Sequence, residues 1–260
     1  MSNRAPAETK RGEEIQSLVK GLAVIKAFSA EHPKMMLAEV ARATGLTRAG
    51  ARRVLLTLKS LDYVATDGRY FQLQPRVLEL GYTYLATQPW WRAAQHVVER
   101  FAEEIDNPVA AGVIDRDSAI YLAHARPQRF KAFVRSVGTR VPIGASAMGR
   151  VLLANLPDDE REARLKELSL VRLTKSTIVD RAVLRDTLVQ IRRTGYALVD
   201  QELEIGLRSL AVPIADRAGH VVAAIGISTS DPMRDAKSLV REHFDLLQAA
   251  AREIALSLPT

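Results

Sequence analysis

Apolar residues at the start of the chain recur with the period of a helix. Between Ser17 and Ala30 they are spaced by three and four positions, which predicts a helix with one apolar face. This face consists of Leu18, Gly21, Leu22, Ile25 and Phe28. Because a proline disfavours helical geometry at the residue before it, His32-Pro33 is expected to end the helix.

A second helix, a tight turn and a third helix are predicted next. Apolar positions within residues 37–41 mark the second helix. Gly45 then supplies a turn, because glycine adopts the left-handed conformation at little cost. Thr47 is expected to cap a third helix that runs to about Leu61.

A β-hairpin is predicted after the third helix. Residues 63–66 and 70–73 have the composition of short strands, and Asp67-Gly68 between them is a strong signal for a tight turn. Helix, helix, turn, helix and hairpin, in this order, are typical of a winged helix-turn-helix. The pattern therefore predicts such a domain over residues 15–74, followed by a linker helix over residues 75–90.

The rest of the chain, residues 91–260, mixes strand and helix patterns. Helices are predicted over residues 94–105, 147–155, 158–168, 181–194 and 235–258. Strands are predicted over residues 109–114, 119–125, 131–137, 196–200, 207–214 and 220–228. Neighbouring strands with interspersed helices indicate an α+β fold for this second domain.

Composition places the chain among ordinary globular proteins. Its 260 residues are 47% hydrophobic and 26% charged, which is enough for two hydrophobic cores. No apolar run approaches the roughly 20 residues that span a bilayer, and the polar start has no signal-peptide core. The absence of cysteine excludes disulfides, thiol catalysis and cysteine-based zinc sites. We therefore expect a cytoplasmic protein with no membrane partner.

The formal net charge of +7 is unevenly distributed. Residues 1–80 carry 13 basic and 8 acidic side chains, whereas residues 81–260 carry 24 and 22. A basic module joined to a nearly neutral one favours a polyanionic partner for the first part. Lys10 and Arg11 fit a flexible basic arm over residues 1–14. Solvated surface charge would produce the same totals, so charge alone does not decide.

The third helix carries the strongest signal for nucleic-acid binding. At about 100° per residue, one side is predicted to pack and consists of Ala51, Val54, Leu58 and Leu61. The opposite side consists largely of Arg48, Ala49, Arg52 and Arg53. The first turns of a recognition helix meet base edges in the major groove, where a guanidinium matches O6 and N7 of guanine.

Each of these residues receives a predicted DNA contact. Arg48 and Arg52 are expected to read bases, and the small Ala49 lets the helix approach closely. The remaining predicted contacts, to phosphate, the minor groove or bases, are made by Ser17, Lys20, Thr47, Arg53 and Arg69. The alternative, that the arginines only solubilise a surface helix, is weaker because the helix order, the turn and the hairpin all agree.

No catalytic constellation is found. The chain has no HExxH motif, no phosphate-binding glycine loop and no GxSxG elbow, and its five histidines lack ligand spacing. No catalytic residue, metal site or cofactor is therefore predicted. Asp200, Glu202 and Glu204 alternate, so in a strand they would share one face. They fit either a carboxylate pair or, more simply, salt bridges that hold a loop.

A small-molecule pocket has better support than a catalytic centre. Residues 144–149, Gly-Ala-Ser-Ala-Met-Gly, lead into an apolar helix, and the free N–H groups behind Ser146 suit a carboxylate. The alternative is that Ser146 only caps a structural helix, because the same residues would be present in that case. Ser209 and Ser228 lie on strands that are expected to be central. Their hydroxyls are expected either to face a pocket or to form a hydrogen bond with a neighbouring carbonyl.

Three stretches resemble the IclR family of bacterial regulators, and the resemblance extends from about Ser17 to Leu258. The stretches are residues 19–25 (VKGLAVI), 138–154 (GTRVPI, continuing through SAMGRVLLA) and 195–213 (GYALVDQE, continuing through GLRSLAVP). The DQELEIGLRS form of the third stretch, together with Met148-Gly149-Arg150, is similar to the subgroup that controls the β-ketoadipate pathway (PcaR, PcaU and PobR-like proteins).

The resemblance implies an N-terminal winged helix-turn-helix and a C-terminal effector-binding domain of GAF-like α/β topology. It also implies homodimers that can pair into homotetramers, and control of aromatic catabolism. The implied effector residues are Phe130, Phe133, Val141, Ala147, Met148, Val199, Ser209, Gly226 and Ser228. Ser146 and Asp200 are added from the residue arguments above.

This lining suits an aromatic acid or a keto-acid, such as protocatechuate, 4-hydroxybenzoate or β-ketoadipate. The Gly144-Ala145-Ser146 loop departs from the Cys-Thr or His-Thr pairing frequent in relatives, which predicts a roomier pocket.

We therefore predict a sequence-specific transcriptional regulator, not an enzyme, that binds a double-stranded DNA operator and responds to a small carboxylate effector. One alternative is a ligand-independent DNA-binding repressor, which is favoured if no metabolite raises the melting temperature. The other is a catalytic domain fused to a DNA-binding module, which is favoured if the purified protein turns over an aromatic acid.

Overall fold

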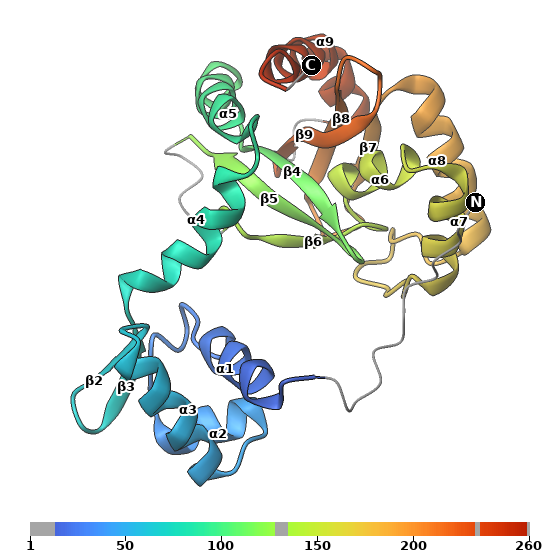
Figure 1. Cartoon of the computed structure of the whole chain (residues 1–260). Helices are drawn as coiled ribbons and strands as arrows, with labels where there is room; N and C mark the ends of the chain where they lie inside the picture. The colour runs from blue at the N-terminus through green and yellow to red at the C-terminus, as the bar shows by residue number, and fades with distance from the viewer. Residues whose placement is uncertain (1–13, 128–134, 232–234, 259–260) are drawn as a thin grey trace, which may run out of the picture. The chain divides into compact units, whose positions relative to one another are not determined.

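The structure of the chain, a computed structural model, describes residues 14–127, 135–231 and 235–258. Its contacts divide it into two units, Met1–Tyr84 and Leu85–Thr260 (Figure 1). The division falls inside the segment 75–90 predicted as one linker helix. That segment contains a short 3-10 helix, η1 (Pro75–Val77), and then α4 (Leu78–Ala86).

The first unit packs helices against a small antiparallel sheet. The helices are α1 (Gln16–Lys26), α2 (Leu37–Thr44) and α3 (Arg48–Ser60). The strands β1 (Lys34–Met36), β2 (Val64–Thr66) and β3 (Tyr70–Leu73) pair in the order β1-β3-β2. Its core is formed around Val24, Val40, Leu55 and Val64. The predicted order of helices and hairpin is present, and the sequence missed only β1, which is too short for its alternation to be recognised.

α1 differs from its prediction in length and in its buried face. It ends at Lys26 rather than Ala30, because Ser29 and His32 exchange backbone hydrogen bonds and close a turn. Val24 is its buried residue, whereas Leu18 and Leu22 are 61% and 43% exposed. The predicted apolar stripe is therefore wrong in its first half.

The packed face of α3 also needs one correction. Ala51, Leu55 and Leu58 are buried, whereas Leu61 is 50% exposed. Leu61 follows the last helical residue, and Asp62 after it has a positive φ of 61°, so the chain has already turned away from the helix axis. The buried stripe therefore ends at Leu58, and Leu55 was the residue missed.

The second unit is built around a six-stranded antiparallel sheet in the order β6-β5-β4-β9-β8-β7. Its strands are β4 (Val109–Asp115), β5 (Ser118–Ala125), β6 (Arg140–Pro142), β7 (Ala197–Asp200), β8 (Arg208–Ala215) and β9 (Val221–Thr229). Its helices are α5 (Trp91–Ile105), α6 (Ala147–Ala154), α7 (Asp158–Glu167), α8 (Arg181–Thr194) and α9 (Ala236–Ala255).

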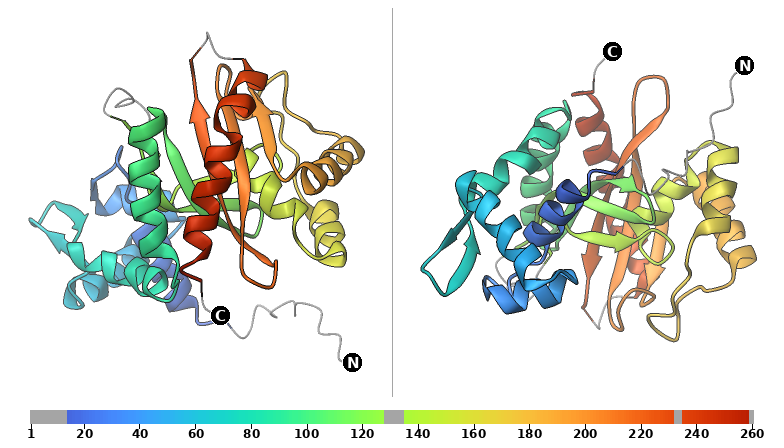
Figure 2. Two further views of the ribbon diagram at one scale, coloured as in Figure 1. Left: turned by 90° about the horizontal axis from the view of Figure 1, so that it is seen from above. Right: turned by 60° about the horizontal axis from the view of Figure 1, so that its bottom comes forward.

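Helices cover both faces of this sheet (Figures 1 and 2). α5 and α9 pack on one face, where alternate strand residues such as Leu210 and Ile225 form a core with them. α6 packs on the other face against Ala211 and Ala224, with α8 behind it. The residues that face α6 are small, which leaves room there for a cavity.

At the edges of this sheet, the predicted strand 196–200 is present as β7, whereas the predicted strand 131–137 is not found in its described part. The predicted strand 131–137 lies mostly outside the described residues, and its described end, residues 135–137, is not a strand. The sheet edge is instead β6, whose three residues pair with β5. At the other edge β7 ends at Asp200, because Gln201 has a positive φ of 59°. Glu202 and Glu204 therefore do not continue a strand face.

Among the helices within the described ranges, none is long and apolar enough to cross a membrane. Within the same ranges, no group of three or more histidine or acidic side chains is placed to hold a metal ion.

Candidate functional site

The start of α3 is built by two local features of the sequence. Gly45 has a φ of 66° and closes α2 in the left-handed conformation. Thr47 caps α3, because its Oγ1 accepts a hydrogen bond of 3.1 Å from the Gly50 amide. The Thr47 hydroxyl therefore has a structural role, and a DNA contact by this residue stays a prediction.

Arginines of α3 project from two different sides of the helix. Arg48, Arg52 and Arg53 are exposed, and none of them forms an ion pair within the residues that the structure describes. At about 100° per residue, Arg48 and Arg52 lie about 40° apart, whereas Arg53 lies about 100° from Arg52. The exposed Ala49 adds little bulk to this surface.

Arg53 belongs to a groove between α1 and α3. Ser17 and Lys20 of α1 line the same groove. The structure therefore brings together three of the predicted DNA contacts, and it separates them from the Arg48 and Arg52 side of α3.

The hairpin between β2 and β3 holds Arg69 at its tip. Asp67 Oδ1 accepts hydrogen bonds from the amides of Arg69 (2.9 Å) and Tyr70 (2.8 Å). The amides of Tyr70 and then Arg69 lower the pKa of the Asp67 carboxyl, so it stays ionised and keeps the turn closed. The Arg69 guanidinium is exposed and lies 5.2 Å from the Tyr70 ring centre.

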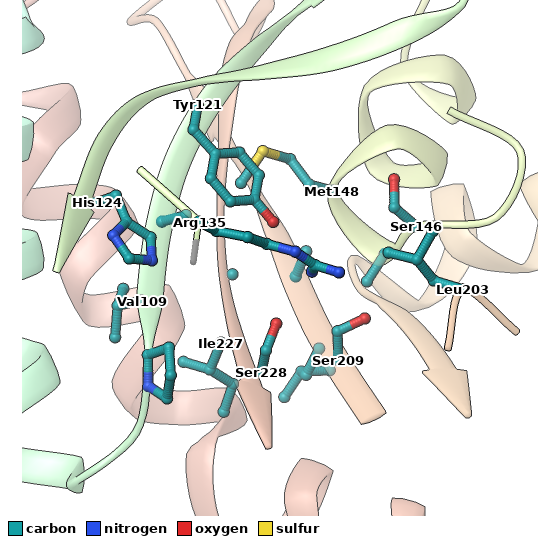
Figure 3. A pocket seen from close by; sticks show the side chains of 16 residues that line it. Val109, Tyr121, His124, Arg135, Ser146, Met148, Leu203, Ser209, Ile227 and Ser228 are labelled. Carbon is teal, nitrogen blue, oxygen red and sulfur yellow. The ribbon is translucent and has the colours of Figure 1, made fainter. Parts of the chain in front are cut away.

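A cavity in the second unit lies between α6 and the sheet face that α6 covers (Figure 3). It receives side chains from β4, β5, β8 and β9 and from the start of α6. Predicted effector residues that line it are Ser146, Ala147, Met148, Ser209, Gly226 and Ser228. Their common feature is small size or flexibility, which suits a flat ligand close to the backbone.

Other predicted effector residues lie elsewhere. Val141 and Val199 are buried in the core around α6 and do not line the cavity. Asp200 is exposed, and its Oδ1 lies 2.9 Å from Arg208 Nε, so this carboxylate is used in an ion pair. Phe130 and Phe133 lie outside the described residues.

The Ser146 hydroxyl already has two hydrogen-bond partners. It donates to the Pro142 carbonyl (2.7 Å) and accepts from the Gly149 amide (3.2 Å), so it caps α6. Gly149 allows this packing, because a Cβ at that position would lie 2.3 Å from Ile143 Cα. Ser146 lines the cavity, but its side chain performs the structural role that the sequence left as an alternative.

Sequence reasoning missed the most polar part of the cavity, Tyr121, His124 and Arg135. The Tyr121 and His124 rings stack with centres 6.0 Å apart and planes 10° apart. Burial raises the pKa of Tyr121, and the nearby Arg135 opposes this only in part, so the phenol keeps its proton.

His124 contributes a neutral ring to the same wall. Burial, followed by the charges of Arg126 and Arg135, lowers its pKa from 6.5, so the imidazole is uncharged at neutral pH. Its Nε2 is buried and has no hydrogen-bond partner among the residues that the structure describes. A buried polar atom of this kind is suited to a ligand hydroxyl.

The loop between β7 and β8, residues 200–206, brings acids to three different arginines. Asp200 pairs with Arg208, Glu202 with Arg150, and Glu204 with Arg135. Each of the three acids therefore forms its own salt bridge. Of the two alternatives left by the sequence, this agrees with salt bridges and not with a carboxylate pair.

The Glu202–Arg150 pair anchors this loop to α6. Both Arg150 Nη atoms donate to Glu202 at 2.6 Å, and Arg150 Nε donates to the Gly144 carbonyl at 2.8 Å. Glu202 Oε2 also accepts from the Ile178 amide at 2.9 Å. Both partners are almost fully buried, so the pair fixes the loop beside the cavity.

Comparison with known proteins matches both units to one family. Residues 17–68 match the IclR helix-turn-helix domain, and residues 82–256 match the bacterial transcriptional regulator IclR C-terminal domain. The Pca regulon regulatory protein of Pseudomonas putida is 35% identical over 258 residues, which cover 99% of this chain and 89% of that protein.

Two further similar proteins extend over nearly the whole chain. The p-hydroxybenzoate hydroxylase transcriptional activator of Acinetobacter baylyi is 30% identical over 252 residues, covering 95% of this chain and 93% of that protein. The crystal structure of an IclR homologue from Microbacterium hydrocarbonoxydans has a TM-score of 0.80 at 23% identity, and the match covers 93% of this chain and 98% of that one.

These matches confirm the predicted fold class, an N-terminal helix-turn-helix domain with a C-terminal α/β domain, and a regulator rather than an enzyme. The chain belongs to the IclR family of bacterial transcriptional regulators.

Proposed function

We propose that this regulator controls genes of aromatic-acid catabolism and that its effector is a hydroxylated aromatic monocarboxylate bound in the α6 cavity. The observation that carries the proposal is Arg135, a partly buried guanidinium among hydroxyl groups and apolar walls. Two similar proteins support this choice: a p-hydroxybenzoate hydroxylase transcriptional activator and an IclR homologue complexed with 4-hydroxybenzoate.

Each part of such an acid has a matching group in the cavity. The planar guanidinium of Arg135 suits a carboxylate, which it can bind through two parallel hydrogen bonds. The hydroxyls of Ser209 and Ser228 and the unpartnered His124 Nε2 suit ring hydroxyls. Met148 provides an adaptable apolar surface for the ring.

The charge of the cavity favours one carboxylate over two. Among the described lining residues, Arg135 is the positively charged group, since the lowered pKa of His124 keeps that ring neutral. A second carboxylate, as in β-ketoadipate, would be desolvated without a partner, which is costly.

Ligand binding by the full-length protein tests this proposal. We expect 4-hydroxybenzoate and protocatechuate to raise the melting temperature, since a ligand at 100 times its Kd stabilises the native state by about 2.7 kcal/mol. Calorimetry against β-ketoadipate is the comparison. Binding of β-ketoadipate alone would favour a keto-acid effector, and no stabilisation by any of the three would favour a ligand-independent repressor.

We further infer that a homodimer, or a homotetramer made of two such dimers, reads the operator. A two-fold protein requires two half-sites separated by about one helical turn of DNA or a multiple of it. Footprinting of the operator, together with light scattering of the free protein, tests this inference.

Arg52→Ala is expected to weaken operator binding by about 1–3 kcal/mol and to relax specificity at one base pair. The reason is that Arg52 is exposed in the first turns of α3, the part of a recognition helix from which an arginine can read guanine. Competition binding with single-base operator variants measures both effects.

Lys59→Ala is the matched control, because it removes an equal charge from the exposed last turn of the same helix. It should lower affinity less and leave base preference unchanged. If Arg52→Ala weakens specific and non-specific DNA equally, Arg52 contacts phosphate instead of a base.

A further inference from the structure

The guanidinium of Arg135, which we assign to effector binding, already forms an ion pair with an acidic side chain of the protein, Glu204. We propose that Glu204 is an internal competitor for the effector carboxylate, which holds Arg135 across the cavity until an aromatic acid replaces it. This inference rests on the proposed function, since it concerns the same cavity and the same class of ligand.

The position of Arg135 is the first observation. Its side chain crosses the cavity, with Tyr121 and Met148 on one side and Ser209 and Ser228 on the other (Figure 3). Only 14% of this side chain is exposed, and its guanidinium forms an ion pair with Glu204. Glu204 is 58% exposed, so the pair joins the buried interior of the cavity to its rim.

The free space in the cavity is the second observation. With Arg135 in place, the cavity holds about 20 Å³. A single water needs about 10–15 Å³, whereas a dry cavity that takes benzene measures about 150 Å³. An aromatic acid therefore enters only if a lining side chain moves away.

Arg135 is the side chain best suited to move. It is long and unbranched, and it lies between the opposite walls, whereas the serines and alanines around it are short and are fixed on strands or on α6. Moving it breaks the ion pair with Glu204, and the carboxylate of the effector then takes the place of Glu204 on the guanidinium. Effector binding and loss of the Arg135–Glu204 pair are therefore one event.

The loop that carries Glu204 is held in place from both sides. On one side, Glu202 is fixed by the buried pair with Arg150, and its carbonyl accepts a 2.7 Å hydrogen bond from Thr177 Oγ1. On the other side, the Gly206 amide donates to Gln201 Oε1 at 3.1 Å. A carboxylate on a fixed loop loses little entropy when it pairs, so it competes more effectively than a mobile surface acid.

Such a competitor lowers the apparent affinity for the effector. The measured Kd equals the intrinsic Kd divided by the fraction of molecules in which Arg135 is available. Removal of the Glu204 charge should increase that fraction and tighten binding of an anionic ligand. It should tighten binding of a neutral ligand of the same shape less, because that ligand also displaces Arg135 more easily but has no negative charge for Glu204 to repel.

Glu204→Gln tests the proposal in the full-length protein by calorimetry. We expect Kd for 4-hydroxybenzoate to fall about fivefold, the fold-change that corresponds to a partly exposed ion pair. Kd for the neutral 4-hydroxybenzamide should fall by less than Kd for the acid. Asp115→Asn is the matched control, because it removes an acid of similar exposure, 46% against 58%, from a pair with Arg140 outside the cavity lining. It should leave both Kd values unchanged.

Four outcomes are distinguishable. Tighter binding in Glu204→Gln that is larger for the acid than for the amide supports the proposal, as does binding that is detected only in this variant. Binding by the wild type that is unchanged or weaker in Glu204→Gln, or that is tightened equally for acid and amide, overturns the competitor but leaves the proposed effector class intact. Failure of both proteins to bind 4-hydroxybenzoate, with protocatechuate also inactive, overturns the effector class and the competitor together.

Discussion

Glu202→Gln is expected to lower the free energy of unfolding of the second unit by about 3–5 kcal/mol, the cost of breaking a buried ion pair by removing one partner. The exposed fractions of the Arg150 and Glu202 side chains are 2% and 9%. Glutamine has nearly the same shape as glutamate, but it leaves the guanidinium without a counter-charge in a place that water does not reach. Loss of this pair is also expected to free the loop between β7 and β8. Leu203, whose side chain lines the cavity, belongs to this loop.

Chemical unfolding followed by tryptophan fluorescence measures this effect. Both tryptophans, Trp90 and Trp91, lie in the second unit, so the signal reports on that unit. Glu162→Gln is the matched control, because the Glu162–Arg185 pair is 36% and 42% exposed. Its expected cost is below about 1 kcal/mol. Equal costs for the two variants would contradict the assigned role of Glu202.

A double variant separates the cost of an unpaired charge from the loss of packing. Arg150→Met with Glu202→Leu removes both charges and keeps apolar volume, so we expect it to recover much of the stability lost in Glu202→Gln. If the double variant is as unstable as the single one, the hydrogen bonds to Gly144 and Ile178 carry the stabilisation instead.

Features set by local chemistry could be predicted from the sequence. The Gly45 turn, the Thr47 cap and the Asp67-Gly68 hairpin depend on residues within a few positions of one another. Small side chains facing α6, among them Gly226 and Ser228, could also be placed, because strand alternation and resemblance both indicate them.

The polar wall of the cavity could not be predicted, because a bulge changes the alternation of β5. Gly112 pairs with Tyr121 but Ala111 pairs with Ala123, so one extra residue stands between them. Tyr121 and His124 therefore share one face, although a strict period of two places them on opposite faces. Neither residue has a local signal for this shift.

Arg135 was missed for a different reason, and the acidic residues that were expected to form salt bridges could not be given their partners. Asp200, Glu202 and Glu204 would share one face only within a strand, and the positive φ of Gln201 ends the strand before Glu202. Which arginine meets which acid depends on how residues about 70 positions apart are folded together, as in the Arg135–Glu204 pair. Such pairs come from tertiary structure and not from a repeating pattern.

Arg135→Gln is expected to weaken 4-hydroxybenzoate binding by about 100-fold, within the range of about 2–5 kcal/mol for losing one partner of a buried charged pair. The variant removes the cation and leaves Glu204 close to the ligand carboxylate, so repulsion adds to the lost attraction. Calorimetry with the full-length protein measures the effect. Operator affinity of the effector-free variant should be unchanged, since Arg135 lies in the second unit and the helix-turn-helix domain, which holds the proposed operator contacts, lies in the first.

Arg208→Gln is the matched control for this loss of charge. The Arg208 side chain is 15% exposed. It pairs with Asp200, at the start of the segment that carries Glu204, and it does not line the cavity. We expect its effect on Kd to be less than about threefold. If Arg208→Gln weakens binding as much as Arg135→Gln, the ligand carboxylate lies nearer to Arg208 than the cavity indicates.

Arg135→Lys distinguishes the charge from the shape of the guanidinium. Lysine keeps the positive charge but cannot offer two parallel donors, so we expect an affinity between those of the wild type and Arg135→Gln. The neutral 4-hydroxybenzamide should not lose affinity in either variant, because it lacks the charge that Arg135 pairs with. A loss of amide binding as large as the loss of acid binding would mean that Arg135 only maintains the shape of the cavity.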